Sequence, residues 1–173
     1  MKEQSRVSNV TNRWTTVLFI VYLIALYWIL LLKLGVRFSY MGSRRANLIP
    51  FNETNILTAE NILNVAIFVP LGIYAGILFK RWILGEKLLF VFLMSLLVEG
   101  IQYFFRLGAF DVTDIITNTS GGVIGLIVFA AIEKAYGGGK AQKFVNKMAA
   151  VGTVLMIFLL ALLKMNMLPI RYQ

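Results

Sequence analysis

Residues 88–105 read LLFVFLMSLLVEGIQYFF, an apolar run of 18 residues in which Glu99 carries the only charge. A helix that crosses the hydrocarbon core of a bilayer needs about 20 mainly apolar residues. A charge at membrane depth is costly, so the one that is present is expected to face other helices or water. We therefore interpret residues 88–105 as a membrane-spanning helix.

Four further apolar runs flank this one, and each is close to the length that a bilayer requires. The first follows a basic start, but no small-residue cleavage site comes after it, so we expect an uncleaved span and not a signal peptide. The sequence thus predicts an all-α fold, a polytopic bundle of about five transmembrane helices in one domain over residues 1–173. The other predicted spans are residues 14–32, 62–79, 112–132 and 148–163.

The composition agrees with a membrane protein. Hydrophobic residues make up 59% of the chain and charged residues 14%, against roughly 45–50% and about 25% in soluble domains. The chain has no Cys and no His, which excludes disulfides, thiolate nucleophiles, Cys/His zinc sites and imidazole acid–base chemistry. Any chemistry must therefore use carboxylates, amides, hydroxyls, Lys or Arg, and we expect no cofactor.

The net charge of +9 comes from basic residues that lie mainly between the apolar runs. A bilayer favours basic residues at those positions, so we expect no nucleic-acid partner. With the N-terminus in the cytoplasm, the inner side carries ten of the 17 Lys and Arg residues, and the short loops at 80–87 and 134–147 are strongly basic. The chain is therefore predicted to be a multi-pass protein of the cell membrane with a cytoplasmic N-terminus and an extracellular C-terminus.

The connection between the first two spans, residues 35–60, is long and contains apolar residues that would be poorly hydrated. Leu48, Ile49 and Phe51 surround Pro50, which argues against a continuous helix there. We expect this segment either to lie at the outer interface of the membrane or to dip into the helix bundle, and the sequence leaves both arrangements open.

Polar side chains recur on three of the predicted spans at the same end of the bundle. On the third and fourth spans they are three or four residues apart, which places them on one helical face. The predicted topology brings all three polar faces to the outer half of the membrane, with Glu99 about 10 Å below Arg106. These residues are Asn61 and Asn64 on the second span, Ser95, Glu99, Gln102 and Arg106 on the third, and Asp111, Asp114 and Asn118 on the fourth.

Several of these polar residues have an ordinary structural interpretation. Asp111 and Asp114 suit the N-terminus of a helix, where carboxylates cap backbone N–H groups and favour the helix dipole. Arg106 can extend to lipid headgroups with no other role. Glu99 is harder to explain in this way, because helix capping does not reach it. It is the strongest candidate for a functional residue.

Small residues indicate where two helices approach each other closely. Gly72 and Gly76 on the second span, and Gly121 and Gly125 on the fourth, share the spacing that lets helix backbones pack tightly. Pro70 is expected to break the second helix near the middle of the membrane and to free the carbonyl of residue 66 as an acceptor. The second and fourth spans are therefore predicted to form a close pair.

The same polar and glycine positions resemble the VanZ-like family over about residues 47–125. The individual patterns are weak, but their order at the ends of successive apolar runs is specific. The matching stretches are Asn47-Leu48-Ile49-Pro50-Phe51, Asn64-x-x-x-Phe68-x-Pro70-x-Gly72, Ser95-x-x-x-Glu99-x-x-Gln102 with Arg106, and Asp111-x-x-Asp114-x-x-x-Asn118-x-x-Gly121-x-x-x-Gly125.

The resemblance implies a small polytopic membrane protein of a mainly Gram-positive family that is tied to low-level resistance to teicoplanin, a lipid-bearing glycopeptide. It carries over no catalytic residue, and the fifth span and the N-terminus match only in being hydrophobic and basic.

The first functional hypothesis is a resistance-associated protein with a polar pocket at the outer leaflet. The pocket would bind a lipid-linked cell-wall headgroup or the lipoglycopeptide itself, with membrane lipid as a partner. Arg44 and Arg45 would hold a phosphate, which Arg recognises well. The predicted pocket residues are Asn64, Glu99, Gln102, Arg106, Asp111, Asp114 and Asn118.

Two alternatives stay open at this point. An intramembrane enzyme could use Glu99, which is deeper and drier, as the acid and Asp114 as the base on a lipid or cell-wall intermediate. The carboxylates and amides could also hold a hard cation such as Mg²⁺ or Ca²⁺. A small proton-coupled transporter with Glu99 as the proton site is less favoured, because the sequence shows no inverted repeat.

Overall fold

The computed structural model of the chain describes residues 2–32, 45–51 and 58–164, and these residues form five α-helices. The predicted all-α fold is confirmed. A pair of two-residue strands, β1 (Ala46–Asn47) and β2 (Phe110–Asp111), was not predicted. The helices are α1 (Lys2–Leu32), α2 (Ala59–Leu78), α3 (Leu84–Phe105), α4 (Val112–Tyr136) and α5 (Gly138–Lys164).

Four helices in the described part of the chain are long and apolar enough to cross a membrane: α1 from Asn12, and α2, α3 and α4 over their full lengths. They correspond to the first four predicted spans. The fifth predicted span, residues 148–163, lies within α5, whose side chains are described only as far as Leu155. That α5 also crosses the membrane stays a prediction.

The described helices expose many large apolar side chains, as expected of surfaces that face lipid. Ile24, Leu89 and Ile127 are examples from three different helices, and each is well exposed. The buried core is small by comparison. One cluster forms where α1, α2 and α3 meet, around Phe68 and Leu71, and a second forms where α2, α4 and α5 meet, around Phe129. An apolar exterior around a limited core supports the assignment to the membrane.

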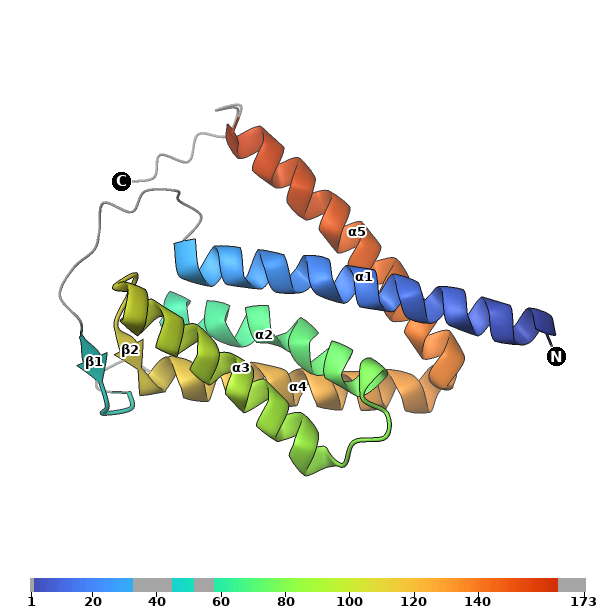
Figure 1. Cartoon of the computed structure of the whole chain (residues 1–173), viewed down its shortest axis with the longest axis horizontal. Coiled ribbons are helices and arrows are strands. Elements are labelled where there is room, and N and C mark those ends of the chain that lie inside the picture. Colours follow the sequence, from blue (N-terminus) through green and yellow to red (C-terminus); the bar gives the residue numbers. More distant parts are fainter. Residues whose placement is uncertain (1, 33–44, 52–57, 165–173) are drawn as a thin grey trace.

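Successive helices from α1 to α4 run in opposite directions, so their ends gather into two groups (Figure 1). The C-terminal ends of α1 and α3, the N-terminal ends of α2 and α4, and both strands lie at one end of the bundle (Figure 1). α5 turns back from the other end and crosses α1 obliquely (Figure 1). All three polar faces predicted from the sequence therefore belong to the end that holds the strands.

The pairing of α2 with α4 depends on glycines, as predicted. A Cβ atom at Gly72 would lie 1.9 Å from the carbonyl oxygen of Gly122, and a Cβ at Gly125 would lie 2.0 Å from that of Val69. A Cβ at Gly121 would similarly lie 2.1 Å from a backbone oxygen of α2. Only hydrogen atoms fit in these gaps, so the two backbones are in direct contact.

Pro70 lies inside α2 and does not divide it, so the predicted break in the second helix is wrong. The hydroxyl of Tyr22 on α1 donates a hydrogen bond of 2.8 Å to the backbone oxygen of Ile67, which lies about one turn before Pro70. A neighbouring helix thus supplies a donor at the place where proline weakens the backbone hydrogen bonding.

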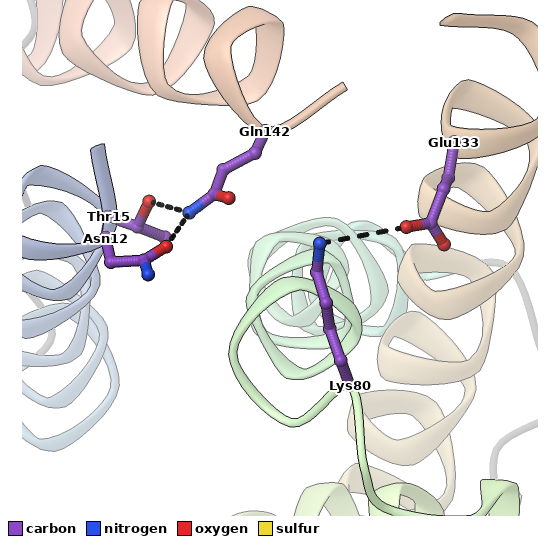
Figure 2. A network of polar contacts seen from close by, with 5 residues as sticks. All are labelled: Asn12, Thr15, Lys80, Glu133 and Gln142. Carbon is purple, nitrogen blue, oxygen red and sulfur yellow. Dashed lines mark hydrogen bonds and ion pairs between the residues drawn. The ribbon is translucent and has the colours of Figure 1, made fainter. Parts of the chain in front are cut away.

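A second polar region joins α1 to α5 near the other end of the bundle. The amide nitrogen of Gln142 donates to Asn12 Oδ1 at 3.0 Å and to Thr15 Oγ1 at 2.8 Å, and Thr15 in turn donates to Asn146 Oδ1 at 3.0 Å. Figure 2 shows the contacts of Gln142. We call these four residues the α1–α5 seam. They fix α5 to the bundle.

Candidate functional site

Residues 45–51 are tied to the start of α4. β1 and β2 pair in parallel, with Asn47 opposite Asp111, and the side-chain amide of Asn47 donates to Asp111 Oδ2 at 2.9 Å. The backbone N–H of Phe51 donates to Thr113 Oγ1 at 3.1 Å. The described part of the connection therefore lies against the mouth of the bundle, while Leu48 and Ile49 stay exposed.

Asp111 links three parts of the site. Its Oδ1 accepts from the backbone N–H of Thr113 at 2.7 Å, and it caps α4 in this way, as predicted. Its Oδ2 holds Asn47, so both oxygens of this carboxylate have partners. Its own backbone N–H donates to Glu99 Oε2 at 3.0 Å, which fixes Glu99 of α3 against the entrance of α4.

Two further hydrogen bonds bring side chains from different helices together beside Glu99. Asn64 of α2 donates to Asp114 Oδ1 of α4 at 2.8 Å. Gln102 of α3 donates to the backbone oxygen of Leu30, near the end of α1, at 3.0 Å. Four helices thus contribute to one polar cluster, and each amide is oriented by the acceptor that its nitrogen contacts.

This cluster borders a cavity of about 550 Å³, which we call the polar cavity. It opens between α1, α2, α3 and the turn that connects α3 to α4. Its lining residues are Ile29, Leu30, Glu60, Leu63, Asn64, Glu99, Gln102, Gly108, Ala109, Asp111 and Asp114.

Five of the predicted pocket residues line the polar cavity: Asn64, Glu99, Gln102, Asp111 and Asp114. They come from three helices, as the predicted topology requires. The structure places Asn118, Arg106 and Arg45 elsewhere.

Asn118 lies deeper than the cavity and does not line it. Its amide nitrogen donates to Ser95 Oγ at 3.1 Å, and its Oδ1 is buried with no partner among the described residues. Asn61 also lies outside the lining, and its backbone N–H donates to the capping oxygen of Thr58. Asn118 therefore belongs to the packing between α3 and α4, beneath the cavity.

Two of the three predicted arginines, Arg45 and Arg106, do not line the polar cavity. α3 ends at Phe105, and Arg106 follows in a left-handed conformation with φ of 58° and an exposed side chain. It therefore does not continue the face of Glu99 and Gln102. Arg45 is also exposed, and Arg44 lies outside the described residues.

Sequence reasoning missed several lining residues. Glu60 adds a carboxylate from the first turn of α2, and its position beside the predicted amides of that helix could have indicated it. Gly108 and Ala109 enter through the turn after α3, while Ile29 and Leu30 come from the end of α1. No pattern marked those four residues, because they belong to a turn or to an unbroken apolar run.

The charge on the described walls of the polar cavity has one sign. Glu60, Glu99, Asp111 and Asp114 line it, and no basic side chain from the described residues does. These carboxylates are nevertheless spread out: within the described structure, no three acidic residues form a group that could hold a metal ion. The hard-cation alternative therefore gains no support from the geometry.

Comparison with known proteins connects this site to one family. The sequence profile described as VanZ/LLP1 matches residues 19–133, which include every described residue that lines the polar cavity. The chain is 37% identical over 147 residues to Protein VanZ of Enterococcus faecium, an alignment that covers 83% of this chain and 88% of that protein. No solved structure matches. The similarity extends beyond residues 47–125, the stretch that contains the family motif positions.

Proposed function

The chain belongs to the VanZ/LLP1 family, and we propose that it protects the cell against teicoplanin and related lipoglycopeptides at the outer face of the membrane. In this proposal the polar cavity binds either a lipid-linked cell-wall headgroup or the antibiotic itself. The family resemblance supplies the link to lipoglycopeptides. The cavity supplies a place where such a molecule could be held.

The observation that carries the proposal is the combination of size and polarity in one cavity. Its volume of about 550 Å³ falls within the range of roughly 300–1,000 Å³ that is usual for small-molecule sites. Glu99 is only 2% exposed, yet it lines the cavity. A carboxylate is rarely kept in such a place for stability alone, because its burial is costly.

The proposal places the polar cavity on the extracellular side. The loops at the opposite end of the bundle are rich in basic residues, including Lys80, Arg81, Lys87 and Lys134. Basic loops favour the cytoplasm. The N-terminus is then cytoplasmic, and with a fifth crossing by α5 the C-terminus is extracellular.

The test is a susceptibility assay in a sensitive Gram-positive host that expresses tagged protein at matched membrane levels. Teicoplanin is compared with vancomycin for wild type, Glu99→Gln and Asp114→Asn. Glu133→Gln is the matched control: Glu133 pairs with Lys80 (Figure 2) near the C-terminal end of α4, whereas the polar cavity lies at the N-terminal end of that helix. We expect wild type and Glu133→Gln to protect against teicoplanin selectively, and the two cavity variants to lose about tenfold in protection.

The outcomes separate the role of the protein from the role of the cavity. If wild type gives no protection, the resistance function is wrong for this chain. If both cavity variants protect as well as wild type, the protein acts in resistance but the polar cavity is not its site.

A second candidate function is an intramembrane enzyme that acts on a lipid or cell-wall intermediate. The observation that favours it is the difference between two carboxylates of the cavity, since Glu99 is buried and Asp114 is half-buried. Carboxyl groups in unlike surroundings can serve as acid and base. Extracted lipids that change in mass when incubated with wild type, and not with Glu99→Gln, would favour this function over simple binding.

A further inference from the structure

Three deeply buried side chains of the polar cavity each have an oxygen atom without a partner among the described residues. Glu99 is 2% exposed, and Asn64 and Gln102 are each 7% exposed. Glu99 uses Oε2 to accept from Asp111, which leaves Oε1. Asn64 and Gln102 direct their nitrogens at Asp114 and at the backbone oxygen of Leu30, which leaves Asn64 Oδ1 and Gln102 Oε1.

The orientation of the two amides is set by the protein. An amide presents donors on its nitrogen and an acceptor on its oxygen. Because both nitrogens are held by acceptors on α4 and α1, the oxygens are the groups left without a contact. These three oxygens are not among the fully buried unpartnered atoms of the described structure, so they are accessible from the cavity. A ligand in the cavity is therefore held best if it donates hydrogen bonds to them.

The charge of the cavity also favours a ligand that donates hydrogen bonds. Its described walls carry four carboxylates and no basic side chain. An anionic phosphate would be repelled there, whereas a cation would offset the cost of keeping Glu99 buried. A primary ammonium group has one positive charge and three N–H donors, which matches the three available oxygens in number.

We propose that the polar cavity binds the primary ammonium group of its ligand, with Glu99, Asn64 and Gln102 as the acceptors. This inference rests on the proposed function, because it names the chemical class of the ligand held in the same cavity. The ammonium could belong to an amine-bearing lipid headgroup or to the antibiotic. The phosphate of a lipid headgroup would remain outside the acidic walls.

The experiment measures binding to the full-length protein in phosphatidylglycerol nanodiscs by native mass spectrometry. In the lipid arm, phosphatidylethanolamine is compared with its N-acetylated form, which keeps the phosphate and the acyl chains but loses the ammonium charge. In the antibiotic arm, teicoplanin is compared with teicoplanin acetylated at its amine. We expect the amine form to bind about tenfold to one hundredfold more tightly in the arm that contains the true ligand.

The variants test whether the cavity is responsible for that preference. Glu99→Gln should remove the discrimination between amine and acetyl forms, and Gln102→Leu should weaken it. Glu133→Gln, which lies outside the cavity, should leave it unchanged. Thermal melting of each variant in the same nanodiscs shows whether the protein is still folded, and only folded variants are scored.

The results overturn the ammonium proposal if amine and acetyl forms bind equally in both arms, if neither form binds at millimolar concentration, or if Glu99→Gln keeps the preference. Failure of the proposed function looks different. A protein that prefers amines through Glu99 but gives no protection against teicoplanin would keep the ammonium site and lose the resistance role. The reverse pattern would keep the resistance role and remove the ammonium site.

Discussion

The α1–α5 seam and the polar cavity both contain buried amides whose nitrogens donate to a neighbouring helix, but only the cavity also carries carboxylates. In the seam, one amide nitrogen contacts two oxygens, and Thr15 passes the contact on to Asn146. In the cavity, Asn64 and Gln102 use their nitrogens in the same way. Their oxygens, like that of Gln142 in the seam, have no partner in the described structure, but in the cavity they accompany Glu99, which also has one oxygen without a partner there.

The difference separates polar groups that only join two helices from polar groups that surround a buried carboxylate and border a cavity large enough for a ligand. Hydrogen bonds between membrane helices contribute only about 0.6 kcal/mol each on average. The seam therefore stabilises the contact between α1 and α5 only through the hydrogen bonds that its side chains make with each other. Unpaired acceptors around a buried carboxylate do not stabilise the bundle. Changing the seam should therefore alter stability, and changing the cavity should alter ligand binding.

The largest expected effect comes from separating α2 and α4, because this pair supports the walls of the cavity. Gly125→Ala would place a methyl group 2.0 Å from the oxygen of Val69. We expect the helices to move apart at a cost of about 3 kcal/mol, with loss of both folded protein and ligand binding. Thermal melting in detergent, followed by size-exclusion chromatography, measures this loss.

Gly100→Ala is the matched control for that change. Gly100 also lies in a membrane-spanning helix, but an added Cβ there would meet no atom within 4 Å. The substitution should be neutral or stabilise α3 by up to about 1 kcal/mol, since Ala favours a helix over Gly. Equal melting temperatures for Gly125→Ala and Gly100→Ala would show that the α2–α4 contact is not tight.

A change in the cavity is expected to have an intermediate effect on stability. It should stabilise the protein, whereas a change in the glycine contact should destabilise it. Glu99→Gln keeps the size of the side chain and an oxygen for the N–H of Asp111, but it removes a buried carboxyl group that pairs with no described cation. We expect the unliganded protein to become more stable by roughly 1–2 kcal/mol while protection against teicoplanin is lost. Melting curves and susceptibility are measured on the same variant. A less stable Glu99→Gln protein would mean that Glu99 serves the fold.

The sequence predicted the helices well, because long apolar runs separated by basic loops are typical of membrane-spanning helices and of few other structures. It also predicted the α2–α4 contact from glycine spacing, and five side chains of the cavity from polar spacing. It failed at Arg106, where helical spacing was extended one residue too far: α3 ends at Phe105, and the left-handed residue turns the chain away.

The remaining features depend on tertiary structure and could not be predicted from spacing. The pairing of β1 with β2 joins residues 64 positions apart through two residues each, too short a stretch to show a strand pattern. Leu30 contributes a backbone oxygen, which any residue type could supply. The seam was missed for a different reason: its polar residues lie towards the ends of the apolar runs on α1 and α5, where polar side chains are common.

The smallest expected effect on stability comes from a change in the seam. This change tests whether the seam contributes to stability without contributing to ligand binding. Gln142→Leu keeps most of the volume of a side chain that is 8% exposed and removes its hydrogen bonds to Asn12 and Thr15. We expect a loss of about 1 kcal/mol, near the sum of two average interhelical hydrogen bonds, measured by unfolding in mixed detergent and SDS. Because the seam lies at the far end of the bundle, protection against teicoplanin and the preference for amine ligands should not change. If Gln142→Leu impaired ligand binding as strongly as Glu99→Gln, α5 would be coupled to the cavity, and the division between a structural and a functional polar cluster would fail.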